Sequence, residues 1–129
     1  MLIGVPREIK NHEYRVGMTP GSVAEAVAHG HQVVVETNAG AGILCSNQDY
    51  IDAGAKVAET ASAVFAGADM IVKVKEPQPI ERAMLRRDQI LFTYLHLAPD
   101  PEQTRDLVNS GAICIAYETV TDAAGRLPL

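Results

Sequence analysis

The stretches VKVKEP at residues 72–77 and LFTYLHLAP at residues 91–99 follow one pattern. Each begins as an apolar strand, places an ionisable side chain where the strand ends, and then reaches a proline, which lacks the N–H that a sheet needs. The ionisable residues are Lys75 and His96. Neighbouring parallel strands end at the same edge of a sheet, and open α/β sheets bind ligands in the crevice outside that edge. The two stretches therefore predict a functional site that contains Lys75 and His96.

Short strand-like runs alternate with helix-like runs along the chain, which predicts a parallel sheet with crossover helices. We expect an α/β fold, an open, mostly parallel, doubly wound sheet with helices on both faces, of the Rossmann or flavodoxin-like kind. Most strand-like runs are apolar on both alternating faces, as in a sheet that is covered on both sides. The expected strands are Leu2–Val5, Val33–Glu36, Lys56–Ala58, Met70–Lys75, Ile90–Tyr94 and Ile113–Tyr117.

Capping residues mark the expected helices. Thr19 can accept a hydrogen bond from free N–H groups of a first turn that starts at Pro20, and Ser46 with Asp49 forms a possible capping box. Asp100 followed by Pro101 gives the clearest start. The expected helices are residues 20–29 before Gly30, 47–53 before Gly54, the segment between Thr60 and Gly67, a short one around 80–87, and the segment between Asp100 and Gly111.

Composition and charge narrow the class of protein. The 129 residues are 47% hydrophobic, which is enough for the core of one compact domain. The net charge of −5 and the scattered basic residues disfavour nucleic acid and an anionic membrane as partners. No apolar run approaches the roughly 18 residues that span a bilayer, and Arg7, Glu8 and Lys10 interrupt any signal-peptide core. We therefore expect a soluble, cytoplasmic protein.

The two cysteines carry no metal or disulfide signature. Cys45 lies in a loop and Cys114 inside an apolar strand, and their spacing fits neither a metal site nor a disulfide framework. We expect Cys114 to be a small buried hydrophobe.

Two further residues are expected at the edge that carries Lys75 and His96. Arg15 lies in the polar loop after the first strand, and its planar guanidinium suits a carboxylate. Glu118 directly follows the last strand and is a fourth candidate without an assigned role. An arginine, an amine and an imidazole together suit a small carboxylate with a carbonyl beside it. Arg15 would hold the carboxylate, Lys75 would bind the carboxylate or the carbonyl oxygen, and His96 would act as general acid or base.

Structural roles compete with these functional ones. A single lysine at a strand end is usually a solvated charge, and a single histidine is more often a hydrogen-bonded structural residue than a catalyst. The shared edge of Lys75 and His96 favours the functional interpretation. Lys73 lies on the same strand face as Lys75, one step inside the sheet, and we expect it to snorkel to solvent or to pair with an acid.

The glycine-rich loop at residues 38–42 (NAGAG) does not read as a nucleotide-binding loop. Cys45 stands where a third glycine is needed, and the next helix begins only after Ser46, too late for its N-terminus to hold a pyrophosphate. We expect a glycine turn at the rim of the crevice. Because the candidate residues cannot accept electrons, a redox cofactor would have to be held elsewhere.

Several motifs in this order resemble the N-terminal segment of the alanine dehydrogenase family, which includes the nicotinamide nucleotide transhydrogenases. The resemblance spans essentially all 129 residues, and a series of separate motifs is far more specific than any one of them. The motifs are Gly4–Lys10, Glu13–Val16, Thr19–Pro20, Lys73–Pro77, Leu91–Ala98 and Ile115–Val120.

The resemblance implies an activity and assigns roles to residues. It implies NAD-dependent oxidative deamination of L-alanine to pyruvate and ammonium, and the reverse reaction, in a homo-oligomer that is usually a hexamer. Arg15 and Lys75 match the family's substrate-binding residues, and His96 matches its proton donor and acceptor. Residues 1–129 would be the N-terminal part of the substrate domain. The NAD-binding Rossmann domain and the aspartate that pairs with the histidine would lie downstream, so this segment alone would be inactive.

A second interpretation is a non-catalytic, transhydrogenase-like structural or interface domain. That branch of the family shares the fold and the opening motif, but we expect its Lys-Val-Lys-Glu-Pro and Leu-His-Leu-Ala stretches to be altered. Both stretches are intact here, which favours the dehydrogenase. Residues 122–125 read as a turn, and the apolar extension at 126–129 that follows suggests a fragment of something longer.

Overall fold

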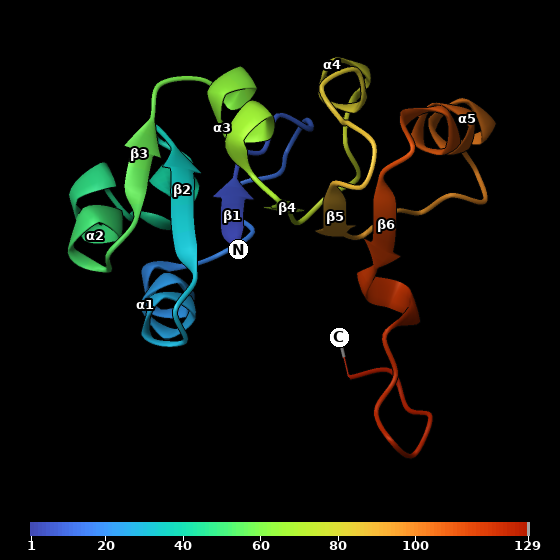
Figure 1. Ribbon diagram of the computed structural model, residues 1–129. Helices are drawn as coiled ribbons and strands as arrows, with labels where there is room; N and C mark the ends of the chain where they lie inside the picture. Colours follow the sequence, from blue (N-terminus) through green and yellow to red (C-terminus); the bar gives the residue numbers. More distant parts are fainter. Residues whose placement is uncertain (129) are drawn as a thin grey trace.

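A computed structural model describes residues 1–128 of the chain; Leu129, the last residue of the predicted apolar extension, lies outside the described residues. Its centre is one six-stranded sheet in the order β3-β2-β1-β4-β5-β6, in which all neighbouring strands are parallel (Figure 1). The strands are β1 (Leu2–Val5), β2 (Gln32–Glu36), β3 (Lys56–Ala58), β4 (Met70–Val72), β5 (Ile90–Thr93) and β6 (Ile113–Ala116).

The strand order makes the sheet doubly wound, as the sequence predicts. The chain runs outward from β1 through β2 to β3, then returns to pair β4 with the other side of β1 and continues outward to β6. Ile3 of β1 therefore faces Val33 on one side and Met70 on the other. The direction of winding reverses between β1 and β4, and such a reversal opens a crevice beyond the carboxyl ends of the strands.

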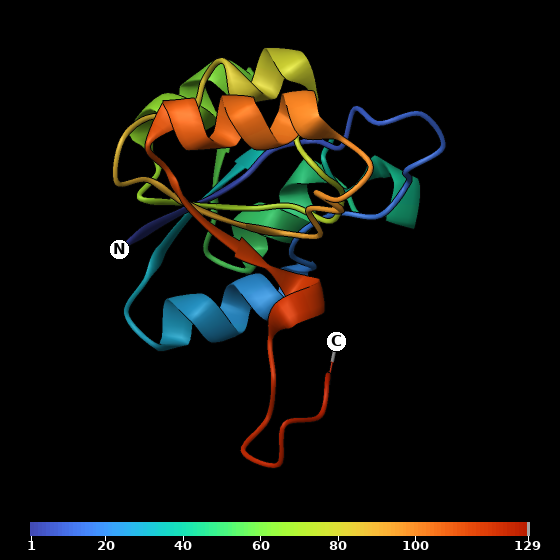
Figure 2. The same ribbon diagram turned by 90° about the vertical axis from the view of Figure 1, so that its right-hand side faces the viewer.

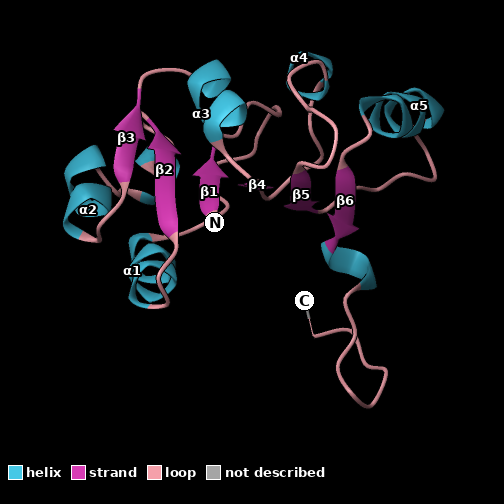
Figure 3. Cartoon of the chain, viewed as in Figure 1, coloured by secondary structure: helices cyan, strands magenta, loops and turns pink. Residues whose placement is uncertain are grey.

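Helices cover both faces of the sheet (Figure 3). Thr19, Ser46, Thr60 and Asp100 cap their helices through their side chains, and Ser46 with Asp49 forms the predicted capping box. Each cap is read from residues within three positions, so the helix starts are predicted correctly. The helices are α1 (Pro20–Ala28), α2 (Asn47–Asp52), α3 (Ala61–Gly67), α4 (Pro79–Arg82) and α5 (Pro101–Ser110), with short 3₁₀ helices η1 (Ala41–Ile43) and η2 (Tyr117–Thr119) that the sequence analysis does not predict.

Two hydrophobic clusters fill the two sides. Val23 of α1 and Tyr50 of α2 pack with β1 and β2 on one face. Phe65 of α3 and Leu107 of α5 pack with Ile71 of β4 and with β5 on the other. Figure 2 shows α1 on one side of the sheet, α4 and α5 on the opposite side, and the segment after β6 extending away from the domain.

Two predicted elements are too long. β4 ends at Val72 instead of Lys75, because the N–H groups of Val74 and Lys75 bind the Glu8 carboxylate rather than a neighbouring strand. α4 ends at Arg82 instead of Arg87, because the chain turns back toward the sheet through tight turns and a left-handed Asp88. Smaller differences of one residue separate the predicted and observed ends of β2, β5, β6, α1 and α2.

The edge strand β6 is less covered than the sequence predicts. The sequence predicts that this strand is covered on both faces of the sheet. In the structure, however, Ile113 and Ile115 are 51% and 38% exposed. Cys114 is half-buried against the α3 and α5 side, so the prediction of a buried hydrophobe holds only in part. Within residues 1–128, no helix is long and apolar enough to cross a membrane.

Candidate active site

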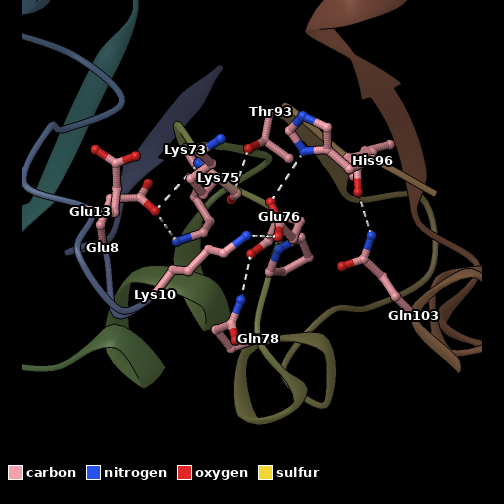
Figure 4. A network of polar contacts seen from close by, with 12 residues as sticks. Glu8, Lys10, Glu13, Lys73, Lys75, Glu76, Gln78, Thr93, His96 and Gln103 are labelled. Atoms are coloured by element: carbon pink, nitrogen blue, oxygen red, sulfur yellow. Dashed lines mark hydrogen bonds and ion pairs between the residues drawn. The ribbon is translucent and has the colours of Figure 1, made fainter. Parts of the chain in front are cut away.

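Lys75 and His96 meet at the carboxyl edge of the sheet, as the two strand-end motifs predict. β4 and β5 are adjacent, so the segments that follow them run side by side (Figure 4). Both side chains approach the ring of Tyr94. The Lys75 ammonium is 6.0 Å from the centroid of the Tyr94 ring, and the His96 ring stacks on the same tyrosine with centroids 5.8 Å apart.

Arg15 lies at this edge and forms an ion pair with Glu13. The guanidinium donates from Nε to one Glu13 oxygen at 2.9 Å and from Nη2 to the other at 2.7 Å. These hydrogen bonds lower the pKa of Glu13 to about 2 against the opposing effect of burial, and the charge of Lys75 also contributes. The same bonds raise the pKa of Arg15. Glu13 therefore lies within electrostatic reach of both cations that the sequence assigns to the substrate.

His96 is held in a left-handed turn, with φ of +48°, and its side chain is 46% exposed. The Glu118 carboxylate accepts hydrogen bonds from the backbone N–H groups of His96 at 2.8 Å and Leu95 at 3.0 Å. Burial raises the pKa of Glu118, but these N–H groups outweigh it and the net shift is downward. The fourth candidate from the sequence thus fixes the turn that presents the histidine.

Glu76 lies between an ammonium and the imidazole. One of its oxygens pairs with Lys10, and the other is 3.3 Å from Nδ1 of His96 (Figure 4). Burial opposes ionisation of Glu76, yet hydrogen bonding and charge from Lys10, with a smaller part from His96, lower its pKa overall. An ionised Glu76 can accept a hydrogen bond from Nδ1–H, which leaves Nε2 as the free nitrogen of the ring.

Lys73 is paired, as one of its two predicted alternatives requires, and it is fully buried. Its ammonium is 2.8 Å from Glu81 and 3.2 Å from Glu8. Burial raises the pKa of Glu81, and the charge of Lys73 opposes this effect. Two carboxylates share one lysine here, so the cluster carries excess negative charge unless one acid is protonated.

Sequence reasoning gives no role to Glu8, Glu13, Glu76 or Thr93, although all four lie in this network. Three of them carry a local signal that could have found them. Glu8 and Glu13 lie in the polar loop that also carries Arg15, and Glu76 directly follows Lys75. Thr93 has no such signal, because its role depends on the pairing of β5 with β4.

Two hollows flank these residues. A smaller one of about 160 Å³ lies between the loop of Arg15 and the glycine loop. A larger one of about 450 Å³ borders His96, and its other lining residues are Leu95, Leu97, Ala98, Pro99, Ala116, Glu118 and Thr119.

The glycine loop borders the smaller hollow, as predicted, and two of its glycines pack closely against other parts of the chain. A Cβ on Gly42 would lie 2.1 Å from the carbonyl oxygen of Tyr14, and one on Gly40 would lie 2.6 Å from the Tyr50 ring. Both glycines thus allow close packing of the chain against itself. The N-terminus of α2 is occupied by its own capping box.

The fold and the clustered side chains define an α/β domain with two cations and an imidazole at the carboxyl edge of its sheet. The family described as the alanine dehydrogenase/PNT N-terminal domain matches residues 4–129, and the chain belongs to this family.

Named relatives support the dehydrogenase branch. The chain is 50% identical over 129 residues to the alanine dehydrogenase of Halomonas elongata and 49% identical over 130 residues to that of Bacillus subtilis. Each match includes 100% of this chain but only 35% and 34%, respectively, of the two relatives. The chain thus spans about a third of the length of the curated relatives that it matches.

Solved structures agree. A structure of an L-alanine dehydrogenase superposes with a TM-score of 0.95 at 50% identity, over 99% of this chain and 35% of that one. A transhydrogenase from Sinorhizobium meliloti superposes with a TM-score of 0.86 at 29% identity, over 92% of this chain and 35% of that one. The two branches share the fold, and the sequence is more similar to the dehydrogenase.

Proposed function

We propose that residues 1–129 supply the substrate-binding half of an NAD-dependent alanine dehydrogenase, which interconverts L-alanine with pyruvate and ammonium. The observation that carries the proposal is the meeting of Lys75 and His96 around Tyr94 at the carboxyl edge of the sheet. The 50% identity to alanine dehydrogenases supports it independently.

Each candidate residue has a chemical role in this reaction. Arg15 and Lys75 bind the substrate carboxylate, and Lys75 can also polarise the carbonyl oxygen. In the reductive direction ammonia adds to the carbonyl carbon; His96 protonates the carbonyl oxygen, takes back a proton from the added nitrogen, and protonates the hydroxyl, which leaves as water while the C=N bond forms. In the oxidative direction water adds to the carbon of the C=N bond, and His96 takes a proton from this water before ammonia leaves. Glu76 on Nδ1 supports this role, since an acceptor on Nδ1 leaves Nε2 available for proton transfer.

A substrate carboxylate that binds Arg15 has to share its guanidinium with Glu13. Glu13 occupies Nε and Nη2, whereas Nη1 makes no hydrogen bond within residues 1–128. Nη1 is therefore available to a substrate carboxylate without displacement of Glu13.

The remaining parts of the enzyme belong to the same proposal. NAD, which accepts the hydride, would be bound by residues other than 1–129, since the glycines of the loop serve to pack it against its own chain. The same holds for the aspartate that the family pairs with its histidine. We expect a cytoplasmic homohexamer that acts on a small molecule rather than on nucleic acid or membrane.

The alternative is a non-catalytic, transhydrogenase-like structural or interface domain, because the Sinorhizobium meliloti transhydrogenase shares this fold, although at lower identity than the dehydrogenase. The length of the reading frame separates the two. A Gly-x-Gly-x-x-Gly or Gly-x-Gly-x-x-Ala segment some tens of residues downstream supports the enzyme, whereas a natural stop after Leu129 supports the non-catalytic domain.

Lys75→Met in the full-length protein tests the substrate role. Losing a charge-assisted hydrogen bond of about 1.5–3 kcal/mol should raise the KM for pyruvate roughly 10- to 100-fold, measured by NADH oxidation with pyruvate and ammonium. Lys56→Met, at an exposed lysine of β3, is the matched control and should leave KM unchanged. An unchanged KM in Lys75→Met would contradict the assignment.

A further inference from the structure

The peptide groups of Lys75 are held by side chains rather than by the sheet. The regular register of β4 with β5 ends at Val72 and Phe92, and the last backbone hydrogen bonds between the two segments are Lys73 N–H to Phe92 and Tyr94 N–H to Val74. Beyond that point the Lys75 carbonyl oxygen accepts a hydrogen bond from the Thr93 hydroxyl at 3.0 Å, and its N–H points to the Glu8 carboxylate at 3.4 Å. The Thr93 hydroxyl and the Glu8 carboxylate come from different parts of the chain, and they bind the carbonyl and the N–H of the same residue, Lys75 (Figure 4).

Glu8 makes its shorter backbone hydrogen bond to Val74, the residue before Lys75. Glu8 accepts the N–H of Val74 at 2.7 Å, and its other oxygen is 3.2 Å from the Lys73 ammonium. Lys73 is in turn 2.8 Å from Glu81 of α4. The chain of contacts thus runs from α4 through Lys73 and Glu8 to the backbone that carries Lys75.

These groups are shielded from water. Thr93 is 0% exposed, Lys73 is 0% exposed and Glu8 is 9% exposed. Water cannot readily replace a hydrogen bond that is lost in such a place, so removing the Thr93 hydroxyl leaves the Lys75 carbonyl without a partner. The backbone would then shift to find one.

We propose that Thr93 is a positioning residue for Lys75: its buried hydroxyl, opposite the Glu8 carboxylate, fixes the Lys75 backbone so that the ammonium reaches the substrate over Tyr94. This inference rests on the proposed function, since it gives Thr93 a role only through a Lys75 that binds substrate. Thr93 itself does not touch the reacting atoms.

Thr93→Val in the full-length protein removes the hydroxyl and keeps the branched shape. The KM for pyruvate should rise roughly 3- to 10-fold, while kcat changes less, and Thr93→Ser should restore the wild-type KM because it restores the hydroxyl. Thr60→Val is the matched control. It removes a hydroxyl that accepts the Ala63 N–H at the start of α3, and it should leave KM unchanged.

A double-mutant cycle separates positioning from mere stability. If Thr93 acts through the Lys75 ammonium, adding Thr93→Val to Lys75→Met should change KM by less than about twofold. An equal effect in both backgrounds would overturn the inference, and so would a wild-type KM in Thr93→Val. If Lys75→Met itself leaves KM unchanged, the proposed function fails instead. If Thr93→Val does not fold, Thr93→Ser and Thr93→Ala provide the comparison, with the rise in KM expected only in the alanine variant.

Discussion

At the scale of single residues, the site is a set of paired charges. Lys75 and His96 could be predicted because each follows a strand, and this feature is local in the sequence. Their partners could not be predicted in the same way, since Glu8 and Val74 are 66 positions apart and Glu76 and His96 are 20 apart. Such contacts depend on which strands become neighbours.

The pair of Glu13 and Arg15 makes a prediction about acid. The pKa of Glu13 falls to about 2 from an ordinary value of 4.5, so the native state binds the proton more weakly than the unfolded state. The stabilisation is therefore complete above pH 4.5 and is lost as the pH falls toward 2. The difference in melting temperature between wild type and Glu13→Gln, followed by circular dichroism, should be largest above pH 4.5 and should shrink below it.

The control for Glu13→Gln is Glu59→Gln, at an exposed acid that forms no ion pair within residues 1–128. It measures the effect of losing one negative charge without losing the Arg15 contact. A melting-temperature difference for Glu13→Gln that stays constant between neutral pH and acid would contradict the lowered pKa.

At the scale of elements, helix starts were predicted correctly and two element ends were not. The caps at Thr19, Ser46 and Asp100 are local hydrogen bonds, so sequence spacing is sufficient. The end of β4 depends instead on Glu8, which takes the N–H groups that would otherwise continue a strand. The apolar alternation of the sequence continues past that point, which explains the error.

Packing between two loops predicts the effect of Gly42→Ala. The new Cβ would lie 2.1 Å from the backbone oxygen of Tyr14, so the loop that carries Arg15 has to move. We expect a loss of about 1–3 kcal/mol in the free energy of unfolding, measured by urea denaturation, and a higher KM for pyruvate.

Gly21→Ala is the matched control for Gly42→Ala. Its Cβ would have Thr19 Oγ1 as nearest neighbour, at 3.9 Å, and alanine favours the helix more than glycine does. This variant should be as stable as wild type or slightly more stable, with an unchanged KM. If Gly42→Ala had the stability and KM of Gly21→Ala, this result would contradict the close contact between the two loops.

At the scale of the whole molecule, the doubly wound sheet could be predicted because strands and helices alternate and the strands are apolar. The exposure of Ile113 and Ile115 could not, because it depends on β6 lying at the edge of the sheet. The strand order brings the loops after β1, β4 and β5 to one edge, and those loops carry Arg15, Lys75 and His96.

Because we propose that the cofactor site lies outside residues 1–129, we expect this segment alone not to bind NAD. A calorimetric titration of this segment with NAD should give no heat of binding, since the glycine loop packs against its own chain, whereas the full-length protein should bind. Circular dichroism of the segment verifies that it is folded. Tight binding of NAD by the folded segment would contradict the proposal that other residues hold the cofactor.

The turnover number of His96→Ala in the full-length protein tests the central claim most directly. If His96 moves the proton to and from the carbonyl oxygen, kcat for reductive amination of pyruvate should fall by at least roughly 100-fold, the low end for a general acid–base residue. The side chain is 46% exposed, so the substitution should leave the fold intact, as circular dichroism can verify. Near-normal turnover in a folded His96→Ala protein would contradict the claim that this edge of the sheet is the active site.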